Sequence, residues 1–424
     1  MELALIGAGS RGMIYAGYAF EKKGIRIAAV VEPDENRRER AARRFEIPAE
    51  RCFAVPEEFF KQGKLCEAAV IASLDRDHYG EVMAALDAGY DLLLEKPISP
   101  EPAECLAIQE RAEALGRKIT VCHVLRYTNF FSKIKEIIDS GRLGRLLSVD
   151  HSENIGNYHM AHSFVRGNWR NSEESSPIIM QKSCHDCDLL VWFTDSAARA
   201  VSSFGTLSYF KKENAPEGAA ARCLECPVAE NCRYDARKAY LPIAGQWPAD
   251  VVSPTDSPKE LLEALKTSPY GRCVYQCDNN VCDHQVTTIE FENGVTATFH
   301  LSAFTNRNHR RIHIMCENGE IYGDDEDNLL EVSFFASNHT EEYTRELIRP
   351  ARAVSGHGGG DSGLVDDFLR LAQGRQESEE SRSSIACSVE SHLIAYAAEL
   401  SRTEGRTVEM AELRKALKET IGKA

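Results

Sequence analysis

The chain has 424 residues, and at roughly 150 residues per domain this length predicts two or three domains. Hydrophobic residues make up 43% and charged residues 27% of the sequence, a globular composition that excludes global disorder. Aspartate and glutamate outnumber lysine and arginine by 65 to 50, for a formal net charge of -15. So acidic a surface repels phosphate groups, and we expect neither nucleic acid nor a membrane as a partner.

The chain shows no membrane or export signal. No apolar run reaches the roughly 20 residues that a bilayer-spanning helix needs. The first residues, MELALIGAGSRG, have no basic segment and lead directly into a glycine turn, so they do not form a signal peptide. We therefore expect a cytoplasmic protein with reduced thiols. Its 14 cysteines are then buried, catalytic or metal-bound rather than paired as disulfides.

Short apolar runs alternate with helical patterns over the first third of the chain. Strands are expected at residues 3–6, 25–31, 68–72, 90–94 and 118–122. Helices are expected between them at residues 10–22, 34–45, 77–88 and 100–115. This alternation predicts an α/β fold with a parallel sheet covered on both faces, and we assign residues 1–123 to a Rossmann domain.

The pattern changes after about residue 145. Apolar and polar side chains alternate in four segments, as in strands with one covered face: residues 146–153, 286–291, 296–302 and 311–317. Asn293-Gly294 between two of them is a hairpin signal. The last 60 residues are mainly helical in pattern, at 364–372, 385–402 and 410–418, with a polar loop at 377–384. We expect a C-terminal α+β domain over residues 124–424 with a large, mostly antiparallel open sheet.

A glycine-rich turn follows the first strand. Gly7, Gly9 and Gly12 fit the pattern G-x-G-x-x-G, and the helix that begins at Ser10 directly follows the turn. The first glycine permits the tight turn, the second admits a pyrophosphate, and the third allows close packing of helix and strand. The free N–H groups and partial positive charge of the helix N-terminus favour phosphate binding. The sequence therefore predicts a dinucleotide site.

An acidic residue ends the second strand. Glu32 lies about 20 residues beyond the glycines, where a carboxylate accepts hydrogen bonds from the ribose hydroxyls and repels a 2′-phosphate. This position favours NAD over NADP. Arg37 and Arg38 keep NADP open as an alternative, because arginines near this position can bind a 2′-phosphate.

Two further segments point to a known family. Ser73-Leu74-Asp75-Arg76-Asp77-His78 and, above all, Glu95-Lys96-Pro97, together with the glycine turn and Glu32, resemble the Gfo/Idh/MocA oxidoreductases. The family is named after glucose–fructose oxidoreductase, inositol dehydrogenase and a rhizopine-catabolism protein. The resemblance covers nearly the whole chain. It implies an NAD-binding Rossmann domain and a C-terminal α/β domain whose open sheet backs the active site and mediates homo-oligomers, dimers or tetramers.

The resemblance also implies which residues bind the cofactor. They lie on the glycine turn, at the ends of the parallel strands and after the last of these strands. The expected set is Gly7, Gly9, Ser10, Arg11, Gly12, Glu32, Ser73, Leu74, Asp75, His78, Glu95, Lys96, Pro97 and Arg126.

The expected catalytic residues are Lys96 and His185. Lys96 lies at the carboxyl end of a parallel strand, where ligands bind and where lost solvation favours proton transfer. The family usually shows Asp-x-x-x-His followed by an Asp three residues after the His. Here His185 and Asp188 match this pattern, while Gln181 replaces the first Asp. Since a glutamine carries no charge, the acid–base work is assigned to Lys96 and His185, and Asp188 is expected to orient substrate hydroxyls.

Polar and aromatic side chains after the first domain suit a polyhydroxylated substrate. Aromatic faces stack on sugar C–H surfaces, while Arg and Asn give directional donors. The predicted substrate-binding residues are Lys96, Tyr158, His159, Arg166, Trp169, Gln181, Lys182, His185 and Asp188. The chain is thus interpreted as an NAD-dependent oxidoreductase that takes hydride from a secondary hydroxyl of a sugar, polyol or glycoside.

Two alternative functions stay open. In the first, the protein is an NAD-dependent glycoside hydrolase that works by transient C3 oxidation, elimination, water addition and re-reduction. This route does not need the two carboxylates of ordinary glycosidases. In the second, the protein binds the nucleotide without catalysis. The presence of Lys96 and His185 argues against this second alternative.

A cysteine cluster lies in a polar stretch at about residues 207–275, which we interpret as an insertion with little apolar core of its own. Cys223, Cys226 and Cys232 follow the spacing C-x2-C-x5-C, and Cys273 comes about 40 residues later. Thiolates at such spacing suggest tetrahedral coordination, with structural zinc as the first interpretation. An iron–sulfur cluster and free thiols are the alternatives.

Overall fold

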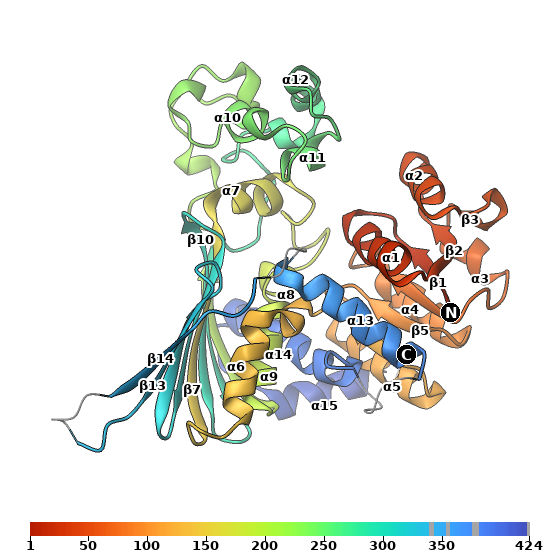
Figure 1. The fold of residues 1–424 in the computed structure, drawn as a ribbon. Helices are drawn as coiled ribbons and strands as arrows, with labels where there is room; N and C mark the ends of the chain where they lie inside the picture. The colour runs from red at the N-terminus through yellow and green to blue at the C-terminus, as the bar shows by residue number, and fades with distance from the viewer. Residues whose placement is uncertain (339–342, 353–356, 375–380, 422–424) are drawn as a thin grey trace.

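The computed structural model describes residues 1–338, 343–352, 357–374 and 381–421 (Figure 1). Residues 377–380 of the predicted polar loop lie outside this part of the chain. Among the described residues, no helix has both the length and the apolar character needed to cross a membrane.

The first domain is built on a parallel sheet, which in the described residues has six strands in the order β3-β2-β1-β4-β5-β6. The strands are β1 (Glu2–Ile6), β2 (Arg26–Val31), β3 (Cys52–Phe53), β4 (Ala68–Ile71), β5 (Asp91–Leu94) and β6 (Ile119–Val121). The helices are α1 (Ser10–Lys23), α2 (Glu35–Phe45), α3 (Pro56–Phe60), α4 (His78–Asp87) and α5 (Pro102–Leu115). The predicted Rossmann fold is confirmed, and its strand order reverses between β1 and β4, where such sheets bind ligands.

The sequence explains why these strands lie inside the domain. β4 and β5 are nearly continuous apolar runs, and from Ala68 to Ile71 every residue is buried, as expected for strands covered on both faces. The turn after β2 ends in a helix cap, because the Asp34 carboxylate accepts a hydrogen bond of 2.8 Å from the Arg37 N–H. The predicted strand and helix positions therefore agree with the structure to within a few residues.

The second domain contains a nine-stranded sheet in the described residues, ordered β14-β13-β12-β11-β7-β10-β9-β8-β15. Its strands are β7 (Leu146–Gly156), β8 (Ala198–Thr206), β9 (His284–Phe291), β10 (Thr296–Thr305), β11 (His309–Cys316), β12 (Gly319–Asp324), β13 (Leu329–Phe334), β14 (Thr344–Ile348) and β15 (Val408–Glu409). β7 and β10 pair in parallel, and the other described neighbours pair antiparallel. The predicted open, mostly antiparallel sheet and its hairpin at Asn293-Gly294 are thus confirmed.

Helices separate this sheet from the first domain. α6 (Asn129–Asp139), α9 (Cys184–Thr194) and α14 (Ile385–Glu404) lie between the sheet and the Rossmann domain in Figure 1. α14 packs on β8, and α9 packs on β7. The face turned away from these helices follows the exposed positions of the alternating strands, such as Phe204 and Val286.

The C-terminal helices connect the two domains. Leu364, Val365 and Phe368 of α13 (Gly360–Ala372) lie in the same buried core as Leu5 and Leu93 of the parallel sheet. α14 and α15 (Met410–Ile421) pack against α5 of the first domain. A division of the chain at residue 123 therefore passes through a shared core, because α13 returns to the first domain late in the sequence.

The predicted insertion forms a separate small lobe above α7 (Asn157–His159) in Figure 1. It contains α10 (Ala236–Tyr240), α11 (Ala249–Val252), α12 (Pro258–Thr267) and several single-turn helices. The lobe buries a core of its own: Cys223, Ala236, Tyr240, Ala249, Leu261, Leu265 and Tyr270. The sequence therefore underestimated the apolar core of the insertion. Small and aromatic residues that are spread along the segment pack together in one cluster.

Candidate active site

The glycine turn after β1 packs tightly against the protein at Gly7 and Gly12 and leaves open space at Gly9. Gly7 has φ +86°, and an added Cβ there would lie 2.5 Å from the Ala72 backbone. At Gly12 an added Cβ would lie 2.1 Å from the Gly7 carbonyl oxygen, so both positions require glycine. At Gly9 an added Cβ would meet no atom within 4 Å. Gly9 therefore leaves the approach to the backbone open, as a bound pyrophosphate requires.

The N-terminus of α1 completes this phosphate cradle. Gly9 caps the helix without a side-chain hydrogen bond, and the first turn carries no acidic residue. The first N–H groups of the helix, beginning with Ser10, have no intrahelical acceptor and carry the positive end of the helix dipole. The residues present fit a dinucleotide, because the donors and the open face lie at the same turn.

Glu32 holds the glycine turn from the end of β2. One oxygen of its buried carboxylate accepts a hydrogen bond of 2.8 Å from the Ala8 N–H, and the other accepts one of 3.1 Å from the Asp34 N–H. Arg38 donates to the backbone carbonyls of Glu32 and Pro33, at 2.6 and 3.2 Å. The Arg38 guanidinium therefore supports this turn.

Arg11 links the glycine turn to the Glu95-Lys96-Pro97 segment. Its guanidinium forms ion pairs of 2.9 Å with Glu95 and 2.5 Å with Asp361 at the start of α13. Tyr15 donates a hydrogen bond of 2.8 Å to the same Glu95 carboxylate. Burial alone would raise the pKa of Glu95, but Arg11 and Lys96 outweigh it and hold this pKa below its usual value. The site is thus anchored by a residue 350 positions downstream of Arg11, which no local motif reveals.

Lys96 lies at the carboxyl end of β5. The Lys96–Pro97 peptide bond is cis, and the half-buried Lys96 Nζ donates a hydrogen bond of 2.7 Å to the Gln181 carbonyl oxygen. The backbone of Gln181 therefore orients the lysine, although its side chain replaces the aspartate of the family pattern. His78 Nδ1 lies 2.8 Å from the Pro97 carbonyl oxygen and holds the same turn.

The loop after β4 lies beside Lys96. Burial raises the pKa of Asp75, while His78 and Lys96 oppose this shift. Ser73 donates a hydrogen bond of 2.5 Å to the Glu81 carboxylate, and the neighbouring Leu74 side chain is 63% exposed. The predicted cofactor-binding residues on this loop are therefore brought to the same sheet edge as Lys96.

His185 begins a row of imidazole rings. It lies in the first turn of α9, and its ring centroid is 5.6 Å from that of His123, which is 5.6 Å from that of His392. Burial, with Arg126 and Lys96, keeps the pKa of His123 well below its usual value. Burial lowers the pKa of His392 to about 3. His123 and His392 are therefore neutral imidazoles that lie in a row behind His185.

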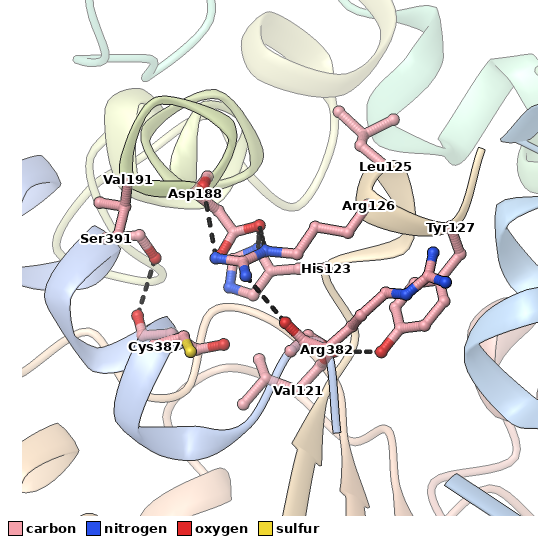
Figure 2. Close-up of polar contacts among 12 residues, drawn as sticks. Val121, His123, Leu125, Arg126, Tyr127, Asp188, Val191, Arg382, Cys387 and Ser391 are labelled. Atoms are coloured by element: carbon pink, nitrogen blue, oxygen red, sulfur yellow. Dashed lines mark hydrogen bonds and ion pairs between the residues drawn. The ribbon is translucent and has the colours of Figure 1, made fainter. Parts of the chain in front are cut away.

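Arg126 and Asp188 form a buried ion pair (Figure 2). Two guanidinium nitrogens of Arg126 lie 2.7 Å from the two carboxylate oxygens of Asp188, and a third donates to the Arg382 carbonyl oxygen at 2.8 Å. Both residues are buried. The groups expected to bind cofactor and substrate are engaged with one another. The geometry favours a positioning role for this pair, because it fixes α9 and thereby His185.

Gln181 and Lys182 use their side chains differently. The Gln181 Nε2 donates to Ser175 Oγ at 2.5 Å and to the Ser176 carbonyl oxygen at 2.6 Å, so this side chain orders the preceding loop. Lys182 Nζ lies 3.3 Å from the carboxylate of Glu153 on β7. The two side chains therefore fix the segment between α8 (Ile178–Gln181) and the start of α9.

A chain of buried charges continues behind Lys182. Glu153 forms an ion pair with Arg310 of β11, whose Nε lies 2.8 Å from Asp186 Oδ1. Asp186 in turn lies 2.8 Å from Nε2 of His151 on β7. Sequence reasoning missed these residues because they come from two strands of the open sheet and one helix. A signal was present, since charged side chains at inward positions of alternating strands are rare.

The remaining predicted substrate residues separate into two groups. Tyr158 Oη accepts a hydrogen bond of 3.0 Å from Asn308, and His159 Nδ1 lies 3.3 Å from Asn308 Oδ1. Burial, with Lys182, lowers the pKa of His159 to about 2, so its imidazole is neutral. The ring of Trp247 from the insertion lies 5.1 Å from that of His159. Tyr158 and His159 thus lie where the insertion meets the second domain.

Arg166 and Trp169 lie elsewhere. The Arg166 side chain is fully buried and donates to the carbonyl oxygens of Arg272 and Tyr234, at 2.7 and 2.6 Å. The guanidinium is thus enclosed at the base of the insertion, and the contact of Arg166 with substrate stays a prediction. Trp169 is 41% exposed and packs on Phe164, with ring centroids 6.1 Å apart.

The zinc interpretation finds no support in the geometry. In the part of the chain that the structure describes, no group of three or more His, Cys, Asp or Glu side chains converges to hold a metal ion. Each of the 14 cysteines is free. Cys223, Cys226, Cys232 and Cys273 nevertheless line one cavity.

A Rossmann sheet with a phosphate cradle at its switch point, and a lysine at the neighbouring strand end, define a nucleotide-dependent oxidoreductase with a second, substrate-side domain. The family models agree. "Oxidoreductase family, NAD-binding Rossmann fold" matches residues 1–123, and "Oxidoreductase family, C-terminal alpha/beta domain" matches residues 135–410. The chain belongs to the Gfo/Idh/MocA oxidoreductase family, as the resemblance implied.

Individual relatives agree with this assignment. Putative oxidoreductase YteT of Bacillus subtilis is 26% identical over 312 residues, which cover 72% of each chain. An inositol 2-dehydrogenase of Leifsonia xyli is 30% identical over 184 residues, which cover 42% of this chain and about half (48%) of that enzyme. Levoglucosan dehydrogenase, solved with NADH and L-sorbose, has a TM-score of 0.70 at 18% identity and covers 97% of this chain and 98% of its own.

A second solved structure gives the same result. An oxidoreductase from Agrobacterium radiobacter, in complex with NAD+, L-tartaric acid and magnesium, has a TM-score of 0.68 at 16% identity. The match covers 97% of this chain and 99% of that one. At such identities the solved structures show that the fold is shared, including the pairing of a Rossmann domain with an open-sheet domain.

Proposed function

We propose that this protein is an NAD-dependent dehydrogenase that takes hydride from a secondary hydroxyl of a sugar, polyol or glycoside. The observation that carries the proposal is the position of Lys96 at the sheet edge of the phosphate cradle, held by the Gln181 carbonyl oxygen at 2.7 Å. The inositol 2-dehydrogenases among the relatives support a polyhydroxylated substrate. The fixed carboxylate of Glu32 supports NAD as the cofactor, since it repels a 2′-phosphate.

The chain's own residues divide the work of binding and proton transfer. The glycine turn and the N-terminus of α1 bind the pyrophosphate, and bound NAD supplies the hydride acceptor. Lys96 Nζ, oriented by Gln181, accepts the proton of the reacting hydroxyl or shares it with His185. Tyr158, His159 and Lys182 bind the remaining hydroxyls from the substrate-side domain. The neutral His159 serves as a hydrogen-bonding group, because its pKa of about 2 excludes proton uptake at neutral pH.

Incubation of the full-length protein with a panel of polyols, sugars and aryl glycosides, with and without added NAD, tests the proposal. Net NADH formation with at least one polyol or sugar is expected. Release of the aglycone without net NADH would replace the dehydrogenase with the redox-assisted hydrolase. NAD binding in calorimetry, without turnover of any compound of the panel, would favour a nucleotide-binding protein and contradict the dehydrogenase.

We also propose a homo-oligomer, a dimer or tetramer, formed through the open face of the second sheet. Phe204 and Val286 face each other on neighbouring strands and are 75% and 41% exposed, and Tyr322 and Leu347 are 47% and 59% exposed. The first two lie on β8 and β9 and the other two on β12 and β14, and exposed apolar side chains on an open sheet face are typical of a protein interface. Light scattering is expected to give two or four times the chain mass, and Phe204→Glu is expected to lower it. A monomer in the unsubstituted protein would contradict this proposal.

The cytosol is the compartment we propose for this protein. All 14 cysteines are free, including the neighbours Cys184 and Cys187 of α9. Free thiols in this number suit a reducing compartment. Fractionation of cells that express the tagged chain is expected to recover it with the soluble cytosolic proteins, and recovery from an oxidising compartment would contradict the assignment.

A further inference from the structure

Two exposed aromatic side chains meet where the insertion joins the second domain. Trp247 of the insertion is 48% exposed and Tyr158 of α7 is 45% exposed, and their ring centroids lie 6.4 Å apart. The imidazole of His159 lies 5.1 Å from the Trp247 ring. Because tryptophan is highly buried on average, an open tryptophan beside a second open ring offers an apolar surface for a ligand.

The insertion holds Trp247 through a packed aromatic cluster. The Trp247 ring lies 5.9 Å from that of His162, which stacks on Tyr270 at 4.6 Å and lies 5.6 Å from the Tyr240 ring. His162, Tyr240 and Tyr270 are all buried. The helix α11 begins two residues after Trp247, and it lies with α12 on the side of the lobe turned toward the Rossmann domain in Figure 1. The position of Trp247 is therefore fixed by the fold of the insertion.

Asn308 fixes Tyr158 from the second domain. Its Oδ1 accepts a hydrogen bond of 2.6 Å from the Gly156 N–H, and its Nδ2 donates one of 3.0 Å to the Tyr158 Oη. His159 Nδ1 lies 3.3 Å from the same Oδ1. An added Cβ at Gly156 would lie 2.8 Å from the Tyr158 ring, so the tyrosine packs directly on this glycine. Tyr158 is thus held in place without a ligand, which reduces the entropy that binding costs.

A first line of contacts connects this aromatic pair with Lys96. The Lys96 Nζ donates to the Gln181 carbonyl oxygen at 2.7 Å, and the next residue, Lys182, forms an ion pair of 3.3 Å with Glu153. Glu153 belongs to β7, which leads directly into α7 and Tyr158. The strand that binds Lys182 therefore also carries the tyrosine of the pair.

A second line of contacts connects the pair with His185. Asp186 directly follows His185 in α9, and its Oδ1 lies 2.8 Å from the Nε of Arg310. Arg310 comes two residues after Asn308, the residue that binds Tyr158. Both expected catalytic residues are therefore joined to the aromatic pair by short contacts and neighbouring residues.

The chemistry of the pair suits a sugar ring. A sugar ring presents C–H groups on its face, which stack on an aromatic ring, and hydroxyls on its edge, which need hydrogen-bond partners. The Tyr158 hydroxyl, the Asn308 amide and the imidazole of His159 supply such partners beside the two rings. These groups are uncharged, so an uncharged sugar binds them without the cost of burying an ion.

We propose that Trp247 and Tyr158 form a second sugar-binding subsite, and that the preferred substrate is a glycoside with two sugar rings. The reacting ring binds beside Lys96 and His185, and the second ring stacks on Trp247. This inference rests on the proposed dehydrogenase function, and it selects the glycoside among sugars, polyols and glycosides. The insertion is then the part of the chain that determines specificity for the second ring.

Steady-state kinetics of the full-length protein with NAD test the subsite. Cellobiose, maltose and lactose are each compared with the methyl glycoside of their non-reducing ring: methyl β-glucoside, methyl α-glucoside and methyl β-galactoside. For at least one pair, the KM of the disaccharide is expected to be at least about tenfold lower. Equal KM values within every pair would overturn the subsite and leave the dehydrogenase intact. A gain for phenyl β-glucoside without a gain for cellobiose would overturn the sugar ring as the occupant.

Substitutions of Trp247 locate the second ring. Trp247→Ala is expected to remove the preference for the disaccharide and to leave the KM of the methyl glycoside unchanged, whereas Trp247→Phe, which keeps a ring, is expected to retain most of it. Phe335→Ala, at an aromatic residue that is 60% exposed after β13, is the matched control. A preference that persists in Trp247→Ala would overturn the proposal. Unchanged hydrogen exchange at the buried Leu261 and Leu265 shows that the insertion stays folded.

Tyr158 is tested by a second pair of variants. Tyr158→Phe keeps the ring and loses the hydroxyl that Asn308 binds, and Tyr158→Ala loses both. The alanine variant is expected to have the higher KM for the disaccharide, because stacking needs the ring. Equal KM values in the two variants would overturn the stacking role of Tyr158, while the Trp247 variants still decide the subsite.

A binding measurement separates failure of the subsite from failure of the dehydrogenase. Trp247 is one of three tryptophans, so a ring stacked on it is expected to change the tryptophan fluorescence. The three disaccharides are added in the presence of NADH, which cannot accept hydride, and the change is expected to be absent in Trp247→Phe. This signal without NADH formation from NAD would keep the subsite and contradict the dehydrogenase. Neither this signal nor a KM preference would overturn the subsite.

Discussion

The cofactor cradle and the cysteine-lined cavity of the insertion are formed by opposite kinds of groups. In the cradle the groups are backbone amides, placed by a parallel sheet and by glycines at which an added Cβ would collide with the chain. In the insertion they are side chains, and three of the cysteines lie on or at the ends of two single-turn helices, at residues 223–225 and 229–231. The comparison teaches that a backbone site depends on the whole sheet, whereas a side-chain site depends on each of its residues.

The largest expected effect is on kcat, and it tests whether proton transfer takes place beside the cofactor cradle. Lys96→Met is expected to lower kcat by about 10²- to 10⁴-fold, the usual contribution of a positioned acid–base group. Lys133→Met, at a half-buried lysine of α6 that pairs with Glu136, is the matched control. Trp247→Ala in the insertion is expected to raise KM with little change in kcat, because Trp247 packs beside His159, a predicted substrate-binding residue. A larger kcat loss for Trp247→Ala than for Lys96→Met would reverse the comparison.

The next effect is on stability, and it distinguishes the core that the two domains share from the core of the insertion. Leu93→Ala in β5 is expected to lower the global free energy of unfolding by about 2–5 kcal/mol, because a buried leucine is lost from the shared core. Leu265→Ala in α12 is expected to speed hydrogen exchange within the insertion, with little change in the global urea midpoint. Equal shifts of the global midpoint by both variants would show that the insertion unfolds with the rest of the chain.

The pH dependence of stability has opposite signs in the two regions. Burial raises the pKa of Glu81 in α4 from 4.5 to about 7, so the folded state holds this proton more tightly than the unfolded state. The free energy of unfolding therefore falls as pH rises from about 4.5 to about 7, by up to about 3 kcal/mol. Glu81→Gln removes this dependence and is expected to flatten the difference between urea unfolding at pH 5 and at pH 8. An unchanged difference would show that another group titrates.

The insertion supplies the contrast for this measurement. Burial raises the pKa of Asp235, but Arg237 outweighs it and holds this pKa below its usual value. The contribution of Asp235 is therefore present at neutral pH and is lost as pH falls through the folded pKa. Asp235→Asn is expected to speed exchange in the insertion at pH 7 and to have less effect at low pH.

The smallest expected effect is on NAD affinity, and it involves the cofactor cradle alone. Gly9→Val is expected to weaken NAD binding at least about tenfold, or about 1.4 kcal/mol, because its side chain occupies the open approach to the backbone. The melting temperature is expected to change little, since the new Cβ meets no atom within 4 Å. Gly12→Ala is the contrasting control, which is expected to destabilise the fold. Unchanged NAD affinity in Gly9→Val would remove the pyrophosphate from this turn.

Local patterns predicted the first domain well. Its strands are continuous apolar runs, and the elements of a parallel sheet follow one another closely, so the glycine turn, Glu32 and Lys96 were placed at one edge from order alone. The sequence did not reveal that Asp188 and Arg126 contact each other. The family pattern marked both residues, but their mutual ion pair across 62 positions depends on how α9 packs.

Contacts between distant segments were beyond the sequence. Arg11 meets Asp361, Lys96 meets the backbone of Gln181, and Lys182 joins a charge chain that crosses β7 and β11. None of these pairings has a short-range signature, because side-chain charge alone does not specify a partner. The burial of Arg166 was also beyond the sequence, since an arginine suits a sugar and a buried cavity equally well.

The sequence by itself determined the Rossmann domain, its phosphate cradle and the open sheet, because hydrophobic period and glycine positions act over a few residues. It also marked the cysteines as unusual. Only the tertiary structure decided that four of them line one cavity beside the buried Arg166. That arrangement depends on the pairing of Arg222 with Arg272 and on burial, which are properties of the folded chain.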